Sequence, residues 1–173
     1  LLPDAWVRLS LSAGKGWTVP WVYQVEGFDQ PFDERTRDCA FVEDRIVVVG
    51  EVFGKHDKFD PWKLSRGSVV EFGTNGAKLS EAVAADEPVM QSGYEAVAPD
   101  GDGGYAAVGY TCDVNVTPCT PTQGIVTWFS PGASLTWAQP VTAAATVWGV
   151  AASPSGGVVV AAEALIKGKG FLA

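Results

Sequence analysis

The side chains best suited to binding chemistry gather in two polar stretches of this sequence, at 26–35 and 54–63. Carboxylates beside an aromatic platform can hold calcium or stack a sugar ring. The same composition is also typical of solvated loops whose aromatic residues pack against a sheet, and this interpretation is favoured. The candidate binding residues are Asp29 and Asp33 in the first stretch and His56, Asp57, Asp60 and Trp62 in the second.

The sequence lacks a catalytic signature. His56 is the only histidine, and neither a G-x-S-x-G nor a cysteine–histidine arrangement accompanies it. A carboxylate pair for glycoside hydrolysis stays open, because the separation that this reaction needs is set in space and not in sequence. Nucleotide binding is disfavoured, since no glycine-rich loop opens a helix. We therefore assign no catalytic residue and no metal ligand, and a non-catalytic role is favoured.

The segment 99–104 reads P-D-G-D-G-G, which is similar to a calcium loop in its aspartates and glycines. The EF-hand spacing, with a glutamate at the twelfth position, is missing. A tight hairpin turn explains the same residues without a metal, because aspartate and glycine are the residues that such turns use. Calcium is thus the cofactor left open, with no specific motif behind it.

The three cysteines bear on whether the protein belongs to an oxidising compartment. Cys112 and Cys119 bracket a short loop, and a local disulfide between them is expected, with two free thiols as the alternative. Zinc is disfavoured, because no second ligand pair follows. Cys39 is expected to begin an inner strand, as a buried free thiol or with a partner outside this chain. A disulfide predicts an extracellular, periplasmic or cell-surface protein.

Composition and charge exclude several classes of protein. The 173 residues are 47% hydrophobic and 18% charged, which excludes intrinsic disorder. The net charge of −8 disfavours nucleic acid and anionic lipid, whose binding depends on basic side chains. No run of apolar residues approaches the length of a membrane span. With nucleic acid and membrane lipid disfavoured, protein and carbohydrate remain as the expected partners. The sequence opens without a methionine and is interpreted as a mature or excised segment.

Short apolar runs bounded by glycine, proline, asparagine and aspartate predict an all-β fold. Three matching runs begin at 45, 104 and 157, and a second set begins at 5, 68 and 125. A glycine turn and a further strand follow each member of the second set. Four short strands therefore recur about three times within one repeat domain. The predicted units are 39–84, 94–141, and 1–25 together with 147–173.

The two sets of runs differ in polarity. The runs 46–49 and 158–162 are apolar without alternation, which predicts strands buried on both faces. Arg8, Glu71 and Thr127 interrupt the other set, which we therefore expect to be partly solvated. Most tryptophans are expected to pack between the sheets, whereas two lie nearer loops and suit exposed contacts. The first group is Trp6, Trp128, Trp137 and Trp148, and the second is Trp21 and Trp62.

The stretches "AVAPDGDGGYAAVGYT" and "GIVTWFSPGASLTWAQPV" resemble the repeats of bacterial secreted β-propeller proteins. The resemblance spans nearly the whole chain in three degenerate copies, and the copy at 150–163 lacks the Gly-Tyr step. It implies a propeller-like array of about three four-stranded antiparallel sheets and carries no catalytic residues. A three-sheet prism or an irregular β-sandwich is the structural alternative. Since propellers have four to eight blades, we expect a segment of a longer propeller.

The function predicted from these features is a non-catalytic extracellular module for interaction or structure. A fragment of a carbohydrate-active propeller enzyme and a lectin-like glycan binder are the alternatives. Alternate turns of such sheets are expected to bring the long connections to one face. Further repeats or another subunit should cover the end sheets, which otherwise expose Trp6, Val7, Trp148 and 158–160.

Overall fold

A computed structural model describes residues 11–12, 17–18, 34–53, 65–83, 90–113, 120–164 and 170–172 of the chain. Every regular element in these ranges is a β-strand, so the predicted all-β class is confirmed. Within the same ranges no helix has the length and apolar character that crossing a membrane requires.

Two four-stranded antiparallel sheets follow one another along the chain. The first sheet consists of β3 (Glu34–Val42), β4 (Arg45–Phe53), β5 (Ser65–Gly73) and β6 (Lys78–Val83) in spatial order β3-β4-β5-β6. The second sheet consists of β7 (Met90–Pro99), β8 (Tyr105–Asp113), β9 (Gln123–Ser130) and β10 (Ser134–Val141) in spatial order β7-β8-β9-β10. These strands fall within or close to the predicted units 39–84 and 94–141.

The third sheet has three strands where four were expected. They are β11 (Ala144–Ala152), β12 (Val158–Ala164) and β13 (Gly170–Leu172), in that spatial order. The short strands β1 (Leu11–Ser12) and β2 (Trp17–Thr18) pair with each other in a sheet of their own. Residues 1–10 lie outside the described ranges, so the predicted joining of 1–25 to 147–173 stays a prediction.

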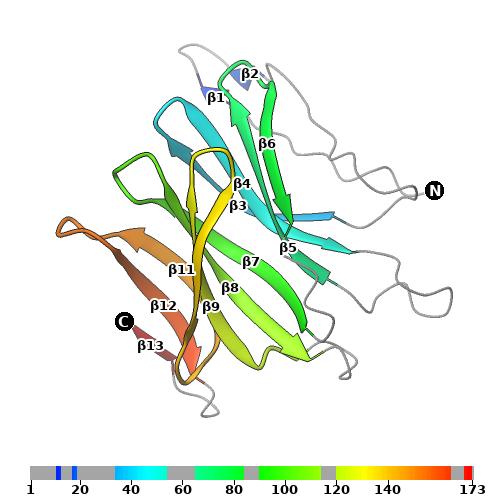
Figure 1. Ribbon diagram of the computed structural model, residues 1–173, viewed down its shortest axis with the longest axis vertical. Coiled ribbons are helices and arrows are strands. Elements are labelled where there is room, and N and C mark those ends of the chain that lie inside the picture. Colours follow the sequence, from blue (N-terminus) through cyan, green and yellow to red (C-terminus); the bar gives the residue numbers. More distant parts are fainter. Residues whose placement is uncertain are drawn as a thin grey trace, which may run out of the picture.

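The second sheet lies between the other two, as Figure 1 shows. Its first strand, β7, contacts β3, β4 and β5 on one side and β11 on the other, while β11 also contacts β8 and β9. The first strands of the three sheets are therefore neighbours in space. Because every neighbouring pair is antiparallel, the tight turns after the first and third strands share one end of the sheets. The long connections begin and end at the opposite end, as expected from the sequence.

Two apolar cores join the three sheets. The first core brings valines of the first sheet, including Val47 and Val49, against Tyr94, Tyr105 and Phe129 of the second. The rings of Tyr105 and Phe129 stack at a centroid distance of 5.3 Å. The second core packs small side chains of the second sheet against the third. Its members are Ala96, Ala106, Val108, Val126, Ala144, Val147, Val160 and Ala162.

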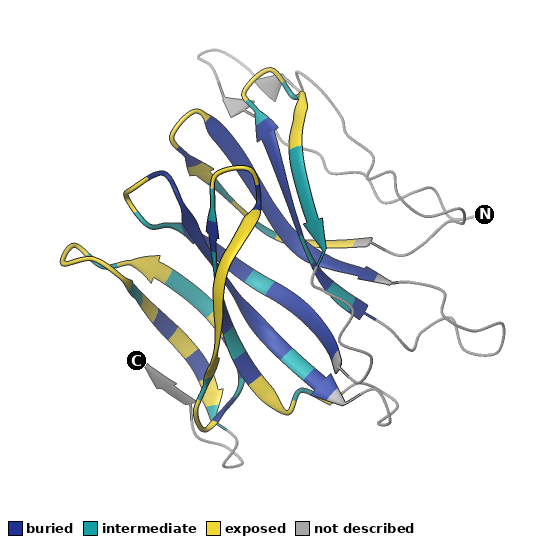
Figure 2. Ribbon diagram, viewed as in Figure 1, coloured by how far each residue is buried: buried dark blue, intermediate teal, exposed yellow. Residues whose placement is uncertain are grey.

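Burial confirms the expectation for one apolar strand and corrects it for the other (Figure 2). In β4 both faces are buried, because Ile46 and Val47 are each at most 2% exposed. In β12 Val160 is buried, but Val159 is 40% exposed. A strand of this composition is buried on both faces only where a sheet packs on each side, and β12 has the second sheet on one side.

The expected solvation of the interrupted strands is wrong for Glu71 and Thr127. Glu71 is 1% exposed and Thr127 is 3% exposed. Both lie on the third strand of a four-stranded sheet, whose faces are still covered by neighbouring elements. A charged residue at such a place needs partners, and Glu71 has Arg45 in its own sheet and three hydrogen-bond donors in the second sheet.

The expected burial of Cys39 and of two tryptophans is also wrong. Cys39 is a free thiol on β3, and it is exposed because β3 is an edge strand. Trp137 and Trp148 are 42% and 53% exposed. Trp128 is half-buried and stacks on Trp137 at a centroid distance of 5.3 Å. The expected packing of tryptophans between the sheets is therefore only partly correct.

Candidate functional site

Each first strand carries a one-residue β-bulge at a corresponding place. The extra residue is Arg37 in β3, Glu95 in β7 and Trp148 in β11. A bulge leaves its extra residue out of the ladder and redirects its side chain. Three side chains of different chemistry are thus presented from three neighbouring strands.

Arg37 joins two carboxylates from different sheets. Its Nη2 atom lies 2.8 Å from Oε1 of Glu51 in β4, and its Nε atom lies 3.6 Å from Oε2 of Glu95 in β7. The hydroxyl of Tyr110 in β8 donates to Oε2 of Glu51 at 2.9 Å. Arg35 approaches Glu51 at 3.6 Å. Glu51 is 3% exposed, so its charge is balanced almost entirely by protein groups.

The protonation states in this cluster suit fixed structural roles. Burial and the nearby charge of Glu51 raise the pKa of Tyr110, so its hydroxyl stays protonated and donates. Burial raises the pKa of Glu95, although the charge of Arg37 opposes the rise. Burial disfavours the charge of Arg37, but the hydrogen bond to Glu51 and the charge of Glu95 outweigh it and raise its pKa. A tyrosine held in this way is a poor nucleophile at neutral pH.

A second charged cluster lies toward the tight-turn end and centres on Glu71. Its Oε1 atom accepts from the hydroxyl of Tyr105 at 3.0 Å and from the amide of Ala133 at 2.9 Å. The amide of Gly132 donates at 3.1 Å, and Nη1 of Arg45 lies 3.5 Å from Oε2. The carboxylate thus fastens the β9–β10 turn of the second sheet to the first sheet.

Arg45 and Asp38 add two further links between the same sheets. Nη2 of Arg45 donates to the carbonyl oxygen of Gly103 in the β7–β8 turn at 2.6 Å. Oδ2 of Asp38 accepts from the amide of Val97 at 3.0 Å. Arg45 and Asp38 therefore hold the first and second sheets together.

The aspartate turn at 99–104 is explained without calcium. Oδ1 of Asp100 accepts from the amides of Asp102 and Gly104 at 2.8 and 2.9 Å, and Oδ2 accepts from Nε1 of Trp128 at 3.0 Å. Burial opposes ionisation, but these hydrogen bonds outweigh it and lower the pKa of Asp100. In the described ranges no cluster of three or more His, Cys, Asp or Glu side chains is arranged to hold a metal ion.

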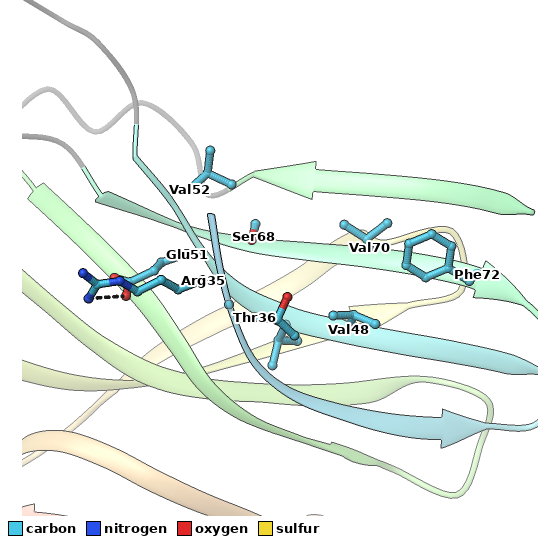
Figure 3. Close-up of a pocket in the computed structure, with 10 residues that line it drawn as sticks. Arg35, Thr36, Val48, Glu51, Val52, Ser68, Val70 and Phe72 are labelled. Atoms are coloured by element: carbon cyan, nitrogen blue, oxygen red, sulfur yellow. Dashed lines mark ion pairs between the residues drawn. The ribbon is translucent and has the colours of Figure 1, made fainter. Parts of the chain in front are cut away.

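A cavity of about 20 Å³ opens on the first sheet beside Arg35 and Glu51 (Figure 3). Thr36 and Ser68 supply hydroxyl groups to its lining, and Val70 and Phe72 supply apolar surface. This volume suits about one water molecule. A small organic ligand needs roughly 300 Å³ or more, so the cavity is too small for one.

The candidate binding residues from the sequence all lie outside the described ranges. Asp29 and Asp33 precede β3, and the remaining residues belong to 54–64, between β4 and β5. Because Glu51 stands two residues before the end of β4, that connection starts close to the Arg37 cluster. Whether the candidate residues bind anything stays a prediction. They are Asp29, Asp33, His56, Asp57, Asp60 and Trp62.

The outer face of the third sheet combines apolar and polar groups that remain exposed. Nε1 of Trp148 donates to Oε2 of Glu163 at 3.3 Å. Val159 and Ala161 are exposed on the same face of β12 as Glu163. This outer face, defined by these four residues, was expected in part from the sequence, which named Trp148 and 158–160.

The Arg37 and Glu71 clusters were missed at the level of sequence. Their members come from strands far apart in the chain, so no local motif joins them. The sequence did contain one signal. Each of the three matched runs ends, after apolar residues, on a side chain that can form hydrogen bonds: Glu51, Tyr110 and Glu163. A scan of the chain against models of protein families finds no match, and a search of curated proteins finds none.

Proposed function

We propose that this chain is a non-catalytic extracellular module of the β-propeller type that binds a partner through the outer face of its third sheet. The exposed pair Trp148 and Val159 carries the proposal. Exposed apolar side chains grouped on one face and bordered by polar ones are typical of interaction surfaces. The apolar residues of the two cores between the sheets, by contrast, are buried.

The propeller assignment is supported by the order of strands. Each four-stranded sheet has its strands in chain order, and the next sheet begins beside the first strand of the last. Blades of a propeller are arranged in this way around an axis. An extracellular location is supported by the expected bond between Cys112, which is buried in β8, and Cys119, which lies outside the described ranges.

A non-catalytic role is supported by how the described charges are used. Glu71, Glu51 and Arg45 are buried and satisfied by partners in the adjoining sheet. The cavity beside Arg35 is too small for a substrate. These groups hold the sheets together and present no open reaction centre.

A glycan-binding role is the second candidate. The indole ring of Trp148 lies beside the carboxylate of Glu163, and tryptophan with a nearby hydrogen-bonding group suits a sugar ring. The stacked pair Trp128 and Trp137 offers a second aromatic surface.

A glycan array and a glycosidase screen on the 173-residue chain test the proposal. We expect no hydrolysis and no glycan signal that depends on Trp148. Hydrolysis that is lost with Glu51→Gln would contradict the non-catalytic role. Glycan binding that is lost with Trp148→Ala but kept with Trp137→Ala would show that the partner is a carbohydrate and not a protein.

A further inference from the structure

The first sheet is buried on a face that neither the second nor the third sheet covers. Ile46, Val48 and Phe72 are at most 5% exposed. Their side chains lie on the face opposite Val47 and Val49, which pack against the second sheet. This burial occurs within a single chain, so the element that covers this outward face belongs to the chain itself.

The second sheet shows what such a cover looks like. Tyr105 and Phe129 match Ile46 and Phe72 in the repeat, and they are also at most 3% exposed. They pack against residues of the preceding sheet, among them Val69 of its third strand, β5. The matching cover for the first sheet is therefore the third strand of a unit that precedes it.

The run 5–9 is the copy of this third strand that precedes the first sheet in the sequence. It matches 68–72 and 125–129, and it lies outside the described ranges. The strands β1 and β2 that follow it pair as an antiparallel hairpin, as the third and fourth strands of the other units do. Figure 1 shows this hairpin at the end of the molecule where the first sheet lies, away from the third sheet.

The third sheet already has a strand in the place that the run 5–9 would fill. Gly170 of β13 is paired with Glu163 of β12. This is the register in which Gly67 of β5 is paired with Glu51 of β4. Because β13 is thus the third strand of its own sheet, a second third-strand copy has its matching place on another sheet.

Successive sheets dock through one pair of positions. A Cβ atom on Gly67 would stand 2.6 Å from the ring of Tyr94, which comes just before the bulge of β7. A Cβ atom on Gly124 would stand 2.9 Å from Cγ2 of Val147, which comes just before the bulge of β11. Each sheet therefore places the residue before its bulge on the residue that precedes the matched run of the sheet before it.

At the first sheet these two positions hold Thr36 and Asp4. The residue before the bulge is smaller than Tyr94, and the residue that it faces is larger than glycine. Thr36 and Ser68 supply hydroxyl groups to the cavity on this sheet (Figure 3). Since hydroxyl groups can donate to a carboxylate, both size and chemistry suit a contact between positions 4 and 36.

We infer that residues 4–9 form a strand that covers the outward face of the first sheet, with Asp4 against Thr36 and Trp6 over the buried centre. In the repeat Trp6 matches Val69, which covers the second sheet in this way. The inference concerns a different face from the proposed partner surface and does not depend on it.

The open edge of the same face fits a cover of this kind. Cys39 and Phe41 of β3 pair with Val48 and Ile46, and they are exposed, Phe41 by 56%. The matching edge strand of the second sheet, β7, is contacted by the first two strands of the preceding sheet, β3 and β4. A third and a fourth strand alone cover the centre of the first sheet and leave its edge at β3 open.

Photo-crosslinking from position 6 of the 173-residue chain tests the inference. Trp6 is replaced by the photoreactive residue p-benzoylphenylalanine, and mass spectrometry maps the crosslinked peptides. We expect crosslinks to 45–53 or 65–73 within one chain. The same probe at Trp148, on the third sheet, is the matched control and should reach neither range. Crosslinks from position 6 that fall elsewhere, that join two chains only, or that do not form overturn the inference.

Thr36→Tyr provides a second measurement. The tyrosine ring should clash with Asp4 and lower the midpoint of thermal unfolding by at least about 3 °C. Adding Asp4→Gly should restore at least about half of this loss, because the pair then copies Gly67 and Tyr94. Asp102→Gly, in an exposed turn of the second sheet, should restore none of it. No loss with Thr36→Tyr, or a loss that Asp4→Gly restores no better than Asp102→Gly, overturns the inference.

Discussion

The hydroxyl of Tyr110 lies over Gly93 and donates to Glu51 of the neighbouring sheet at an Oη–Oε2 distance of 2.9 Å. Glu51 is 3% exposed, so its carboxylate has little water to replace a lost donor. Tyr110→Phe should therefore lower the free energy of unfolding by about 1.5–3 kcal/mol. Urea unfolding followed by fluorescence measures this change. Thr142→Ala, at an exposed turn, should cost less than about 0.5 kcal/mol, and equal effects of the two substitutions would contradict the role of Tyr110.

Glu71 makes the stability of the protein depend on acid. Burial opposes its ionisation, but the amides of Ala133 and Gly132 and the hydroxyl of Tyr105 outweigh this and hold its pKa below the ordinary 4.5. A carboxyl with a lowered pKa stabilises the folded state above its unfolded pKa, and that contribution is lost as the pH falls through its folded pKa. The free energy of unfolding should thus decrease below about pH 4.5.

Glu71→Gln isolates this contribution. The variant should be less stable at pH 7 by about 3 kcal/mol, because Arg45 and two amides lose their charged partner. Below pH 4.5 the stability of the wild type should approach that of the variant, at up to about 1.4 kcal/mol per pH unit. Parallel pH profiles for the two proteins would show that Glu71 does not titrate with the expected shift.

Gly109 tests the geometry of the bulged strands. A Cβ atom at this position would stand 1.9 Å from the carbonyl oxygen of Gly93, and backbone cannot move aside cheaply. Gly109→Ala should destabilise the protein by about 3 kcal/mol or more. Gly149→Ala is the matched control, because its Cβ would meet Ala161 at an ordinary 3.7 Å. Thermal unfolding of both variants checks the difference, and a Gly109→Ala protein as stable as Gly149→Ala would refute the packing.

The cysteines should divide into one free thiol and one bonded pair. Mass spectrometry under non-reducing conditions should find Cys112 joined to Cys119, and reduction should cost about 2–3 kcal/mol of stability. Native alkylation should modify Cys39 alone, since it is free and exposed. Burial and the neighbouring charge of Asp38 raise the pKa of Cys39, so labelling should quicken as the pH rises above 9. Labelling of all three cysteines in the unreduced protein would exclude the bond.

The strand pattern was predictable from the sequence because it depends on local features. The turns at 43–44 and 131–133 carry glycine, proline or charged residues between apolar runs, and the strands follow from them. The repeated order of strands along the chain also follows from this pattern. The strand pattern could not show which face of β12 is exposed, because exposure of a face depends on whether another sheet packs on it.

The charged clusters could not be predicted in the same way. Glu71 appeared to be a solvated residue because its partners Tyr105 and Ala133 lie in another sheet, far along the chain. Cys39 appeared to be buried because it was expected to begin an inner strand, but strand order places β3 at an edge. Burial of a residue within a strand thus depends on the order of strands, which composition does not contain.

Dye binding to the folded 173-residue chain measures whether the outer face of the third sheet is an interaction surface. A hydrophobic dye, with light scattering recorded on the same sample, should detect this face. Val159→Lys should remove at least half of the dye signal, and Leu79→Lys, at a residue that is 55% exposed elsewhere, should remove little. A soluble monomer that binds no dye, or equal losses in the two variants, would show that this face is not an interaction surface.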